Sequence, residues 1–164
     1  MYQASAPRFA AMLRNLSALL DKASAHCEAK KIDPAALTTF RLYPDMFPLT
    51  RQVQIACDTA KGAVARLAGA EIPKHEDTEQ TFADLKARIA KTVDFIESVK
   101  AERIDGTEDK EIVLQMRSGE RRFKGMPYLL GFAYPNFYFH ITTAYNILRH
   151  NGVELGKLDF LGKP

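Results

Sequence analysis

Two polar residues in the C-terminal part of the chain have the types and the spacing for chemistry. Asn136 and His140 are four residues apart in a segment whose apolar residues recur at helical spacing, so they share one face of a helix. The apolar residues around His140 predict that its ring is buried. A buried imidazole needs a hydrogen-bond partner or a metal, because unpaired nitrogens are costly in free energy. This pair is therefore the first candidate for a functional site.

A second polar pair, Gln54 and Asp58, has the same spacing in an earlier helical segment. We expect one of these two to face Asn136 and His140 across the core, with Tyr145 placed to orient a bound molecule. One interpretation is a ligand or metal pocket lined by Gln54, Asn136 and His140; the other is a satisfied polar pair inside a helical core. Transition-metal sites usually take three or four His, Cys, Asp or Glu ligands, and His140 is the one strong ligand in this set.

The remaining histidines and the two cysteines have simpler interpretations. His26, His75 and His150 lie in polar surroundings or at a helix end and are expected at the surface. Cys27 and Cys57 form no zinc-type spacing, so we expect reduced, partly buried thiols in a cytoplasmic protein, with a disulfide between them left open.

The composition describes an ordinary globular chain. The 164 residues predict a single domain over 1–164, and 46% of them are hydrophobic. The formal net charge is +3, with both signs interspersed, which argues against a nucleic-acid partner because such proteins gather their basic residues on one face. No stretch approaches about 18 consecutive apolar residues, which argues against a membrane span.

Hydrophobic periodicity predicts four long helices, at about 7–31, 47–69, 78–100 and 136–150. The connector 32–46 is expected to hold about one turn of helix at 34–37. Asp77 and Gln80 resemble a capping box at the start of the third helix. A shorter helix at 126–134 is expected to break at Pro135, because proline cannot continue a helical hydrogen-bond ladder.

A β-hairpin is predicted before the last helix. Ile112, Leu114 and Met116 alternate with more polar residues, Ser118-Gly119 offers a turn, and the alternation resumes toward Phe123. The C-terminal tail 153–164 is expected to pack through Leu155, Leu158, Phe160 and Leu161. These elements predict a mainly α fold: a four-helix bundle with a small β-hairpin inserted before the last helix.

Several sequence segments resemble a known bacterial family. They are 123–125, 135–145 (PNFYFHITTAY), 148–153 (LRHNGV), 155–157 and 159–162, together with 65–69 (ARLAG), 72–73 and 81–82. The chain resembles the domain of unknown function 1993 family (DUF1993), and the resemblance covers nearly its whole length. That family is similar to the DinB/YfiT-like superfamily of metalloenzymes. The resemblance therefore implies a DinB-like four-helix bundle that forms homodimers.

The resemblance also implies where a metal would bind. Metal-binding members place one histidine on the second bundle helix and two more, four residues apart, on the last. Counted back from Gly152, His140 takes the position of the final ligand and Asn136 that of its partner, while Gln54 or Ile55 falls near the second-helix ligand. Asn and Gln are much poorer ligands for zinc or nickel than imidazole, so the metal position is expected to be degenerate. The thiol-transferase activities of the superfamily are not carried over.

Two functions follow as expectations. The first is a small-ligand or partner-binding module with a degenerate metal site and no cofactor. The alternative is a metal-dependent enzyme of transferase or hydrolase type that holds zinc or nickel on His140, or uses it as a general base, with Asn136, Gln54 and Tyr145 orienting a substrate. For either function we expect a homodimer without a nucleic-acid or membrane partner.

Overall fold

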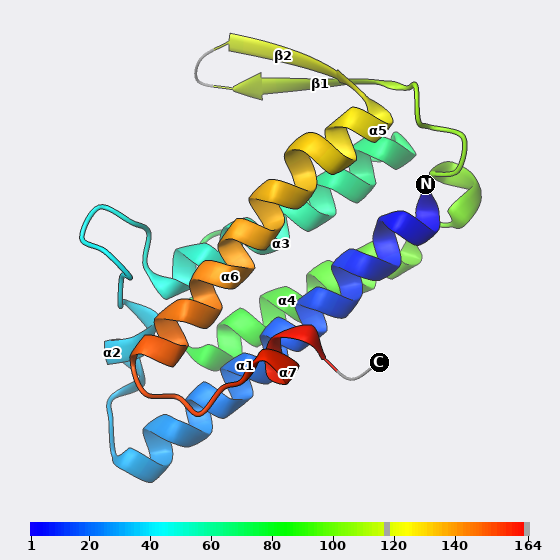
Figure 1. Ribbon diagram of the computed structural model, residues 1–164. Helices are drawn as coiled ribbons and strands as arrows, with labels where there is room; N and C mark the ends of the chain where they lie inside the picture. Colours follow the sequence, from blue (N-terminus) through cyan, green and yellow to red (C-terminus); the bar gives the residue numbers. More distant parts are fainter. Residues whose placement is uncertain (117–118, 163–164) are drawn as a thin grey trace.

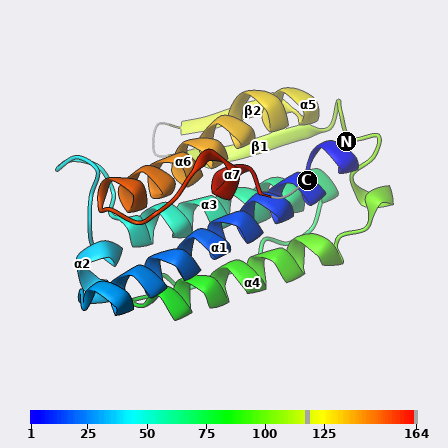
Figure 2. The ribbon, with the colours of Figure 1, turned by 60° about the horizontal axis from the view of Figure 1, so that its bottom comes forward.

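Four long helices form the body of the protein. The computed structural model describes residues 1–116 and 119–162, and its long helices are α1 (Ala6–Lys30), α3 (Leu49–Ala68), α4 (Phe82–Ser98) and α6 (Tyr134–His150). Helix α3 packs against both α4 and α6, and α1 packs against α4 (Figures 1 and 2). The predicted four-helix bundle with an inserted hairpin is confirmed.

The core is built from the apolar stripes that the periodicity predicts. On α1, Phe9, Leu13, Leu16 and Leu20 are fully buried. The Phe9 ring meets Phe137 of α6 edge-on, with ring centroids 4.8 Å apart. Edge-to-face contacts of this kind add to the free energy gained by burying the rings, so they hold α1 against α6.

Helix α4 begins later than the sequence predicts. Its N-cap is Thr81, whose hydroxyl accepts from the Asp84 backbone N–H at 3.1 Å, while the Asp84 carboxylate accepts from the Thr81 backbone N–H at 2.9 Å. The predicted capping box of Asp77 and Gln80 is therefore wrong. The physical reason for the later start is that the Asp77 carboxylate forms ion pairs with Arg51 and Arg88 instead. These ion pairs keep the residues before Thr81 out of the helix.

The hairpin consists of β1 (Glu111–Met116) and β2 (Gly119–Lys124), paired antiparallel with Ile112 opposite Phe123. Ile112 and Leu114 point inward and are buried. Of the expected turn, Ser118 lies outside the described residues, and Gly119 begins β2 with φ +111°, a backbone conformation that favours glycine.

The chain continues from β2 into one uninterrupted helical rod. Helix α5 (Gly125–Tyr128) leads into a π-helical segment (Leu129–Ala133) and then directly into α6. The predicted break at Pro135 is wrong, because the wider hydrogen-bond spacing of the π-helical turn just before it lets the helix accept a proline in the first turn of α6. Gly125 is required at the junction, since a Cβ there would collide with the Thr107 carbonyl.

Two short helices pack against the bundle. Helix α2 (Pro34–Thr38) lies in the connector as predicted, and helix α7 (Lys157–Leu161), which was expected only as an irregular tail, packs along α1. Leu155 is buried and Phe160 is partly buried against Tyr145. Leu158 and Leu161 do not serve as anchors, because they are 78% and 53% exposed on the outer side of α7.

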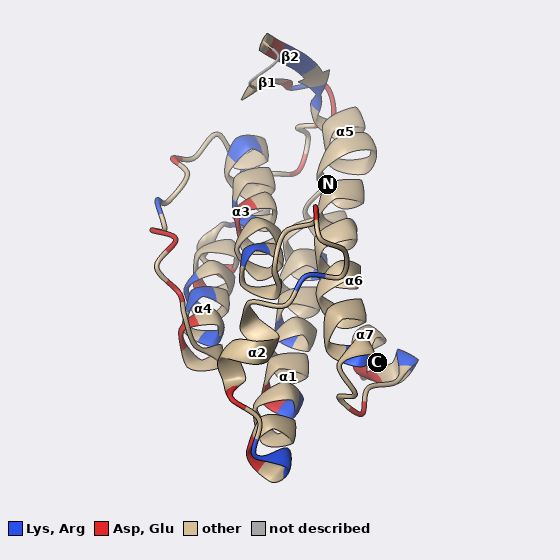
Figure 3. Cartoon of the chain, turned by 90° about the vertical axis from the view of Figure 1, so that its left-hand side faces the viewer, with Lys and Arg blue, Asp and Glu red and all other residues tan. Residues whose placement is uncertain are grey.

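Charged residues of both signs lie on α1, α3, α4 and the loops, whereas α5 and nearly all of α6 carry none (Figure 3). Strand β2 is the most basic element in this view, with Arg121, Arg122 and Lys124, and its Arg122 is paired with Glu111 and Glu120. Among the described residues, no helix has both the length and the hydrophobicity needed to cross a membrane.

Replacement of Thr81 by alanine tests the observed start of α4. The substitution removes the hydroxyl that accepts from the Asp84 N–H, and loss of such an N-cap costs about 1 kcal/mol of unfolding free energy. Urea unfolding of Thr81→Ala should show this loss. Thr78→Ala, three residues earlier in the exposed loop, should unfold like the unchanged protein, and equal effects of the two substitutions would contradict the assignment.

Candidate functional site

His140 is held by a hydrogen bond across the interface between α3 and α6. Its Nδ1 lies 2.7 Å from Oε1 of Gln52, which is 1% exposed. The amide nitrogen of Gln52 donates to the Phe47 backbone carbonyl at 2.9 Å, so its oxygen is the acceptor for the histidine. Nδ1 therefore carries the proton, and the Nε2 of a neutral ring is left as an acceptor.

The surroundings of His140 favour this neutral ring. Burial, and secondarily the positive charge of Arg51, lower its pKa below the ordinary histidine value. Phe139 meets the imidazole edge-on with centroids 5.2 Å apart, and the Arg51 guanidinium lies 6.0 Å from the Phe47 ring. The rings of Phe47 and Phe139 are 54% and 56% exposed, and Phe139 presents an apolar surface directly beside the histidine on α6.

Asn136 and Tyr145 have other partners. The Asn136 amide donates to the Phe132 carbonyl at 2.7 Å, one turn earlier in the same helical rod. The Tyr145 ring packs edge-on against Phe160 of α7, with centroids 5.8 Å apart. Helical spacing puts Asn136 one turn from His140, but its amide is used to satisfy a carbonyl beside the π-helical segment.

Gln54 and Asp58 face α4 and the loop before it, on a different side of α3 from His140. The Gln54 amide donates to the Glu79 carboxylate at 2.8 Å, and its oxygen accepts from Arg51 at 3.1 Å. The expectation that Gln54 or Asp58 meets His140 is corrected: the residue of α3 that does so is Gln52. Two residues along a helix rotate the side chain by about 200°, which is why Gln52 and Gln54 face opposite sides.

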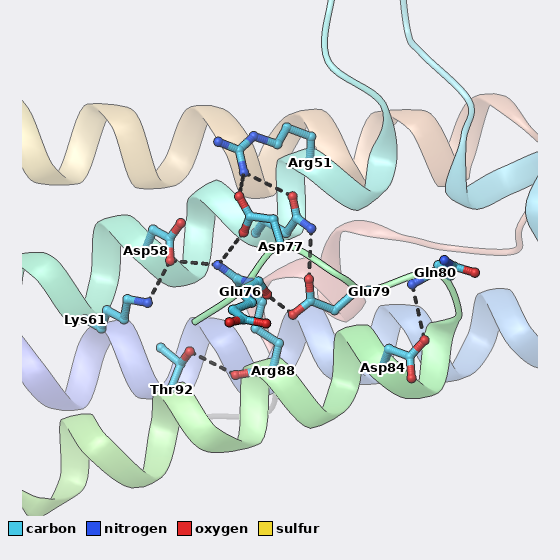
Figure 4. A network of polar contacts seen from close by, with 11 residues as sticks. Arg51, Asp58, Lys61, Glu76, Asp77, Glu79, Gln80, Asp84, Arg88 and Thr92 are labelled. Atoms are coloured by element: carbon cyan, nitrogen blue, oxygen red, sulfur yellow. Dashed lines mark hydrogen bonds and ion pairs between the residues drawn. The ribbon is translucent and has the colours of Figure 1, made fainter. Parts of the chain in front are cut away.

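The side of α3 that carries Gln54 and Asp58 holds a network of ion pairs centred on Arg88 of α4 (Figure 4). The Arg88 side chain is 2% exposed. Its Nη1 donates to the Glu79 carboxylate at 2.9 Å and to the Glu76 backbone carbonyl at 3.1 Å. Its Nη2 lies 2.8 Å from a carboxylate oxygen of Asp58 and 3.0 Å from one of Asp77. One guanidinium thus joins α4, α3 and the loop between them.

The network is electrically balanced. Arg51 pairs with Asp77, and the Lys61 Nζ lies 2.9 Å from the Asp58 oxygen that Arg88 also contacts. Three cations therefore meet three carboxylates: Arg51, Lys61 and Arg88 with Asp58, Asp77 and Glu79. Burial favours the neutral form of Glu79, but its hydrogen bonds from Arg88 and Gln54 outweigh that effect and lower its pKa.

Two buried polar atoms beside this network lack a hydrogen-bond partner among the described residues: Arg88 Nε and His75 Nδ1. His75, expected at the surface, is partly buried, and burial lowers its pKa, as do the charges of Lys61 and Arg88. Both residues line a cavity of about 490 Å³ between the loop and the first turns of α4.

Sequence patterns contained only weak signals for the residues that matter here. Arg88 stands three residues after Leu85 and four before Thr92, on the buried stripe of α4, where an arginine must find anionic partners. Gln52 is one of two glutamines that flank Val53 on a helix that is otherwise rich in alanine. The residues next to Arg88 and Gln52 in sequence do not indicate their partners. The partners of Arg88 lie on α3 and in the loop before α4, and the partner of Gln52 lies on α6.

The residues around His140 do not fit a transition-metal site. Within 1–116 and 119–162, no group of three or more His, Cys, Asp or Glu side chains is placed to hold a metal ion. Gln52 and Asn136 use their amides in hydrogen bonds to the protein, and neutral amide oxygens are weak ligands for zinc or nickel. Cys27 and Cys57 are free and buried, and burial raises the pKa of Cys57 to about 12, which removes its nucleophilic thiolate.

Comparisons with known proteins define the class of the fold and then the family. The structure is similar to the crystal structure of a DinB family member protein from Shewanella denitrificans, with a TM-score of 0.94 and 46% sequence identity over 99% of this chain and 92% of that chain. The sequence also matches a domain of unknown function, DUF1993, over residues 1–161, so the chain belongs to this family. No curated protein matches the chain.

Replacement of Arg88 by methionine tests the role of the network. The variant leaves up to three carboxylates without their shared cation, and breaking a buried ion pair in this way costs about 3–5 kcal/mol of unfolding free energy at pH 7. Because the folded pKa of Glu79 is lowered from 4.5, its stabilising contribution is present above about pH 4.5 and is lost as the pH falls through the folded pKa. The difference between variant and unchanged protein should therefore shrink in acid.

Urea unfolding between pH 7 and pH 3 measures both effects. Arg122→Met is the matched control, because Arg122 pairs with Glu111 and Glu120 on the exposed hairpin, where ion pairs contribute little. A destabilisation by Arg88→Met that is no larger than that of Arg122→Met, or that does not change with pH, would contradict the central role of Arg88.

Proposed function

We propose that this protein is a small-ligand-binding module of the DinB-like type in which the metal position is degenerate. The observation that carries the proposal is the hydrogen bond between His140 Nδ1 and Gln52 Oε1. Gln52 lies on the second bundle helix, two residues before Gln54, the residue that the resemblance places near the second-helix metal ligand. In this chain a neutral hydrogen bond between Gln52 and His140 joins α3 to α6.

The arrangement supports binding of a neutral molecule that carries an O–H or N–H donor. Nε2 of the neutral His140 ring is the acceptor for that donor, and the exposed ring of Phe139 supplies apolar surface beside it. Arg51 lies next to Phe47, but its charge is paired with Asp77 and adds none to the site. A few directional polar groups bordered by aromatic side chains are typical of small-molecule sites.

The alternative function, a metal-dependent transferase or hydrolase that uses His140, needs further ligands that the described residues do not bring to the ring. We infer that the protein acts without zinc or nickel. A general-base role for His140 would also need a substrate group and an orienting acid at Nε2, and the partner of Nδ1 is the neutral amide of Gln52 rather than a carboxylate.

The assembly and the compartment are part of the proposal. A homodimer is supported by the DinB-like fold and by the exposed apolar side chains of Leu130 in the π-helical segment and Tyr138 on α6. A cytoplasmic location is supported by the two free, buried thiols, Cys27 and Cys57.

The tautomer of His140 tests the proposed site directly. Long-range ¹H–¹⁵N spectra should show protonated Nδ1 and unprotonated Nε2 near neutral pH, because the Gln52 oxygen fixes the proton on Nδ1. Gln52→Ala should lose this preference, whereas Gln54→Ala should retain it. Elemental analysis of protein purified without chelator should give no stoichiometric zinc or nickel. Stoichiometric metal that His140→Ala abolishes would establish the metal-dependent alternative instead.

Light scattering tests the assembly. At micromolar concentration the scattering mass should be twice that of one chain, because the apolar surface around Leu130 and Tyr138 is covered in a dimer. Leu130→Ser should shift the mass toward one chain, while Leu158→Ser, the same substitution on the exposed side of α7, should leave it unchanged. A mass of one chain for the unchanged protein would refute the dimer.

A further inference from the structure

A small cavity lies between α3, the π-helical segment and strand β1, apart from both His140 and the cavity beside Arg88. Its volume is about 270 Å³. Its wall combines charged, polar, aromatic and aliphatic groups, contributed by Asp58, Thr59, Arg66, Leu114, Gln115, Met116, Tyr128 and Phe132. Helix α3 and the later segment that holds β1, α5 and the π-helical turn therefore build one hollow.

The cation of this cavity is Arg66, and a glycine on α3 leaves room for its side chain. Its guanidinium lies over Gly62, one turn earlier on α3, so closely that a Cβ at Gly62 would stand 2.5 Å from Nη1. Nη1 donates to the Tyr128 hydroxyl at 3.3 Å, and no carboxylate of the described residues lies within 4.0 Å of the guanidinium. Arg66 thus differs from Arg88, whose terminal nitrogens are all engaged with the protein.

Helix α5 and the π-helical segment supply the aromatic wall, with Tyr128 at the end of α5 and Phe132 in the π-helical segment. Tyr128 and Phe132 are four residues apart, and their rings stack with an interplanar angle of 20° and centroids 6.0 Å apart. Phe123 of β2 packs against both rings, at 5.9 and 5.4 Å, and fixes them in place. Extra-residue turns of this kind are frequent at functional sites because they re-aim side chains.

The local charge favours an anion. The carboxylate of Asp58 also borders the cavity, but Lys61 Nζ and Arg88 Nη2 lie 2.9 and 2.8 Å from one of its oxygens and offset its charge. Arg66 is left as the cation whose charge no side chain of the described residues balances. Because a guanidinium matches the two oxygens of a carboxylate in a planar fork, a carboxylate is the anion that fits best.

We infer that the cavity is a second ligand site, which binds a small aromatic carboxylate with its carboxylate on Arg66 and its ring against Tyr128, Phe132 and Met116. The volume lies below the roughly 300–1,000 Å³ of pockets for drug-sized ligands, which limits the ligand to about one ring. The site is independent of the function proposed at His140, because the two share no residue.

The experiment titrates the protein with 3-phenylpropionate and follows Met116 methyl and Tyr128 ring signals by NMR. We expect saturable shifts of these signals. The isosteric neutral compound 3-phenylpropionamide should bind at least about tenfold more weakly, because it lacks the charge that pairs with Arg66. Arg66→Gln should weaken binding of the carboxylate by a similar factor, and Arg66→Lys, which keeps the charge without the planar fork, should fall between the two.

Two control variants define the site. Arg14→Gln, on the opposite pair of helices, and His140→Ala should both leave the affinity for 3-phenylpropionate unchanged. Equal binding of the amide and the carboxylate, unchanged affinity in a folded Arg66→Gln variant, or absence of shifts at millimolar ligand would each overturn the inference. Loss of binding in His140→Ala would also overturn it, since the carboxylate would then occupy the site proposed at His140.

Discussion

The pairing of the buried Arg88 guanidinium is the interaction on which the arrangement of α3, α4 and their connecting loop depends. A guanidinium cannot lose its proton in a protein, so a chain that buries one must bring carboxylates to it. This requirement draws Asp77 and Glu79 down from the loop and Asp58 across from α3 (Figure 4). It also explains why α4 starts at Phe82, because the preceding residues are committed to Arg88 rather than to a helical turn.

The opposite side of α3 is governed by a neutral hydrogen bond instead of a charge. There Gln52 meets His140 of α6, and the same amide reaches back to the Phe47 carbonyl at the start of α3. Helix α3 thus carries an ionic network on one face and, on the other, the uncharged hydrogen bond between Gln52 and His140. The bond to Gln52 leaves Nε2 of the neutral His140 ring as an acceptor.

Much of the fold could be predicted because each long helix has a regular apolar stripe. The bounds of α1 and α3 fall within two residues of the prediction, and the alternation at Ile112 and Leu114 predicts the hairpin correctly. Two of the errors, at Asp77 and Pro135, arise where a local sequence signal is overridden by an ion pair or by a π-helical turn. A third concerns Leu158 and Leu161, which α7 turns outward. The candidate site was predicted less well: His140 and Asn136 were chosen from spacing, but spacing does not show which way Gln52 and Gln54 point across the bundle.

The sequence by itself determined the class of fold, the DUF1993 membership and the shortage of metal ligands, because periodicity, motif and residue type are properties of the chain. Only the tertiary structure decided the partners: Gln52 for His140, four separate groups for Arg88, and the open guanidinium of Arg66 over Gly62. The physical reason is that hydrogen bonds and ion pairs join atoms within about 3 Å, while the residues that carry them are tens of positions apart. The packing of the helices therefore decides which of these residues come into contact.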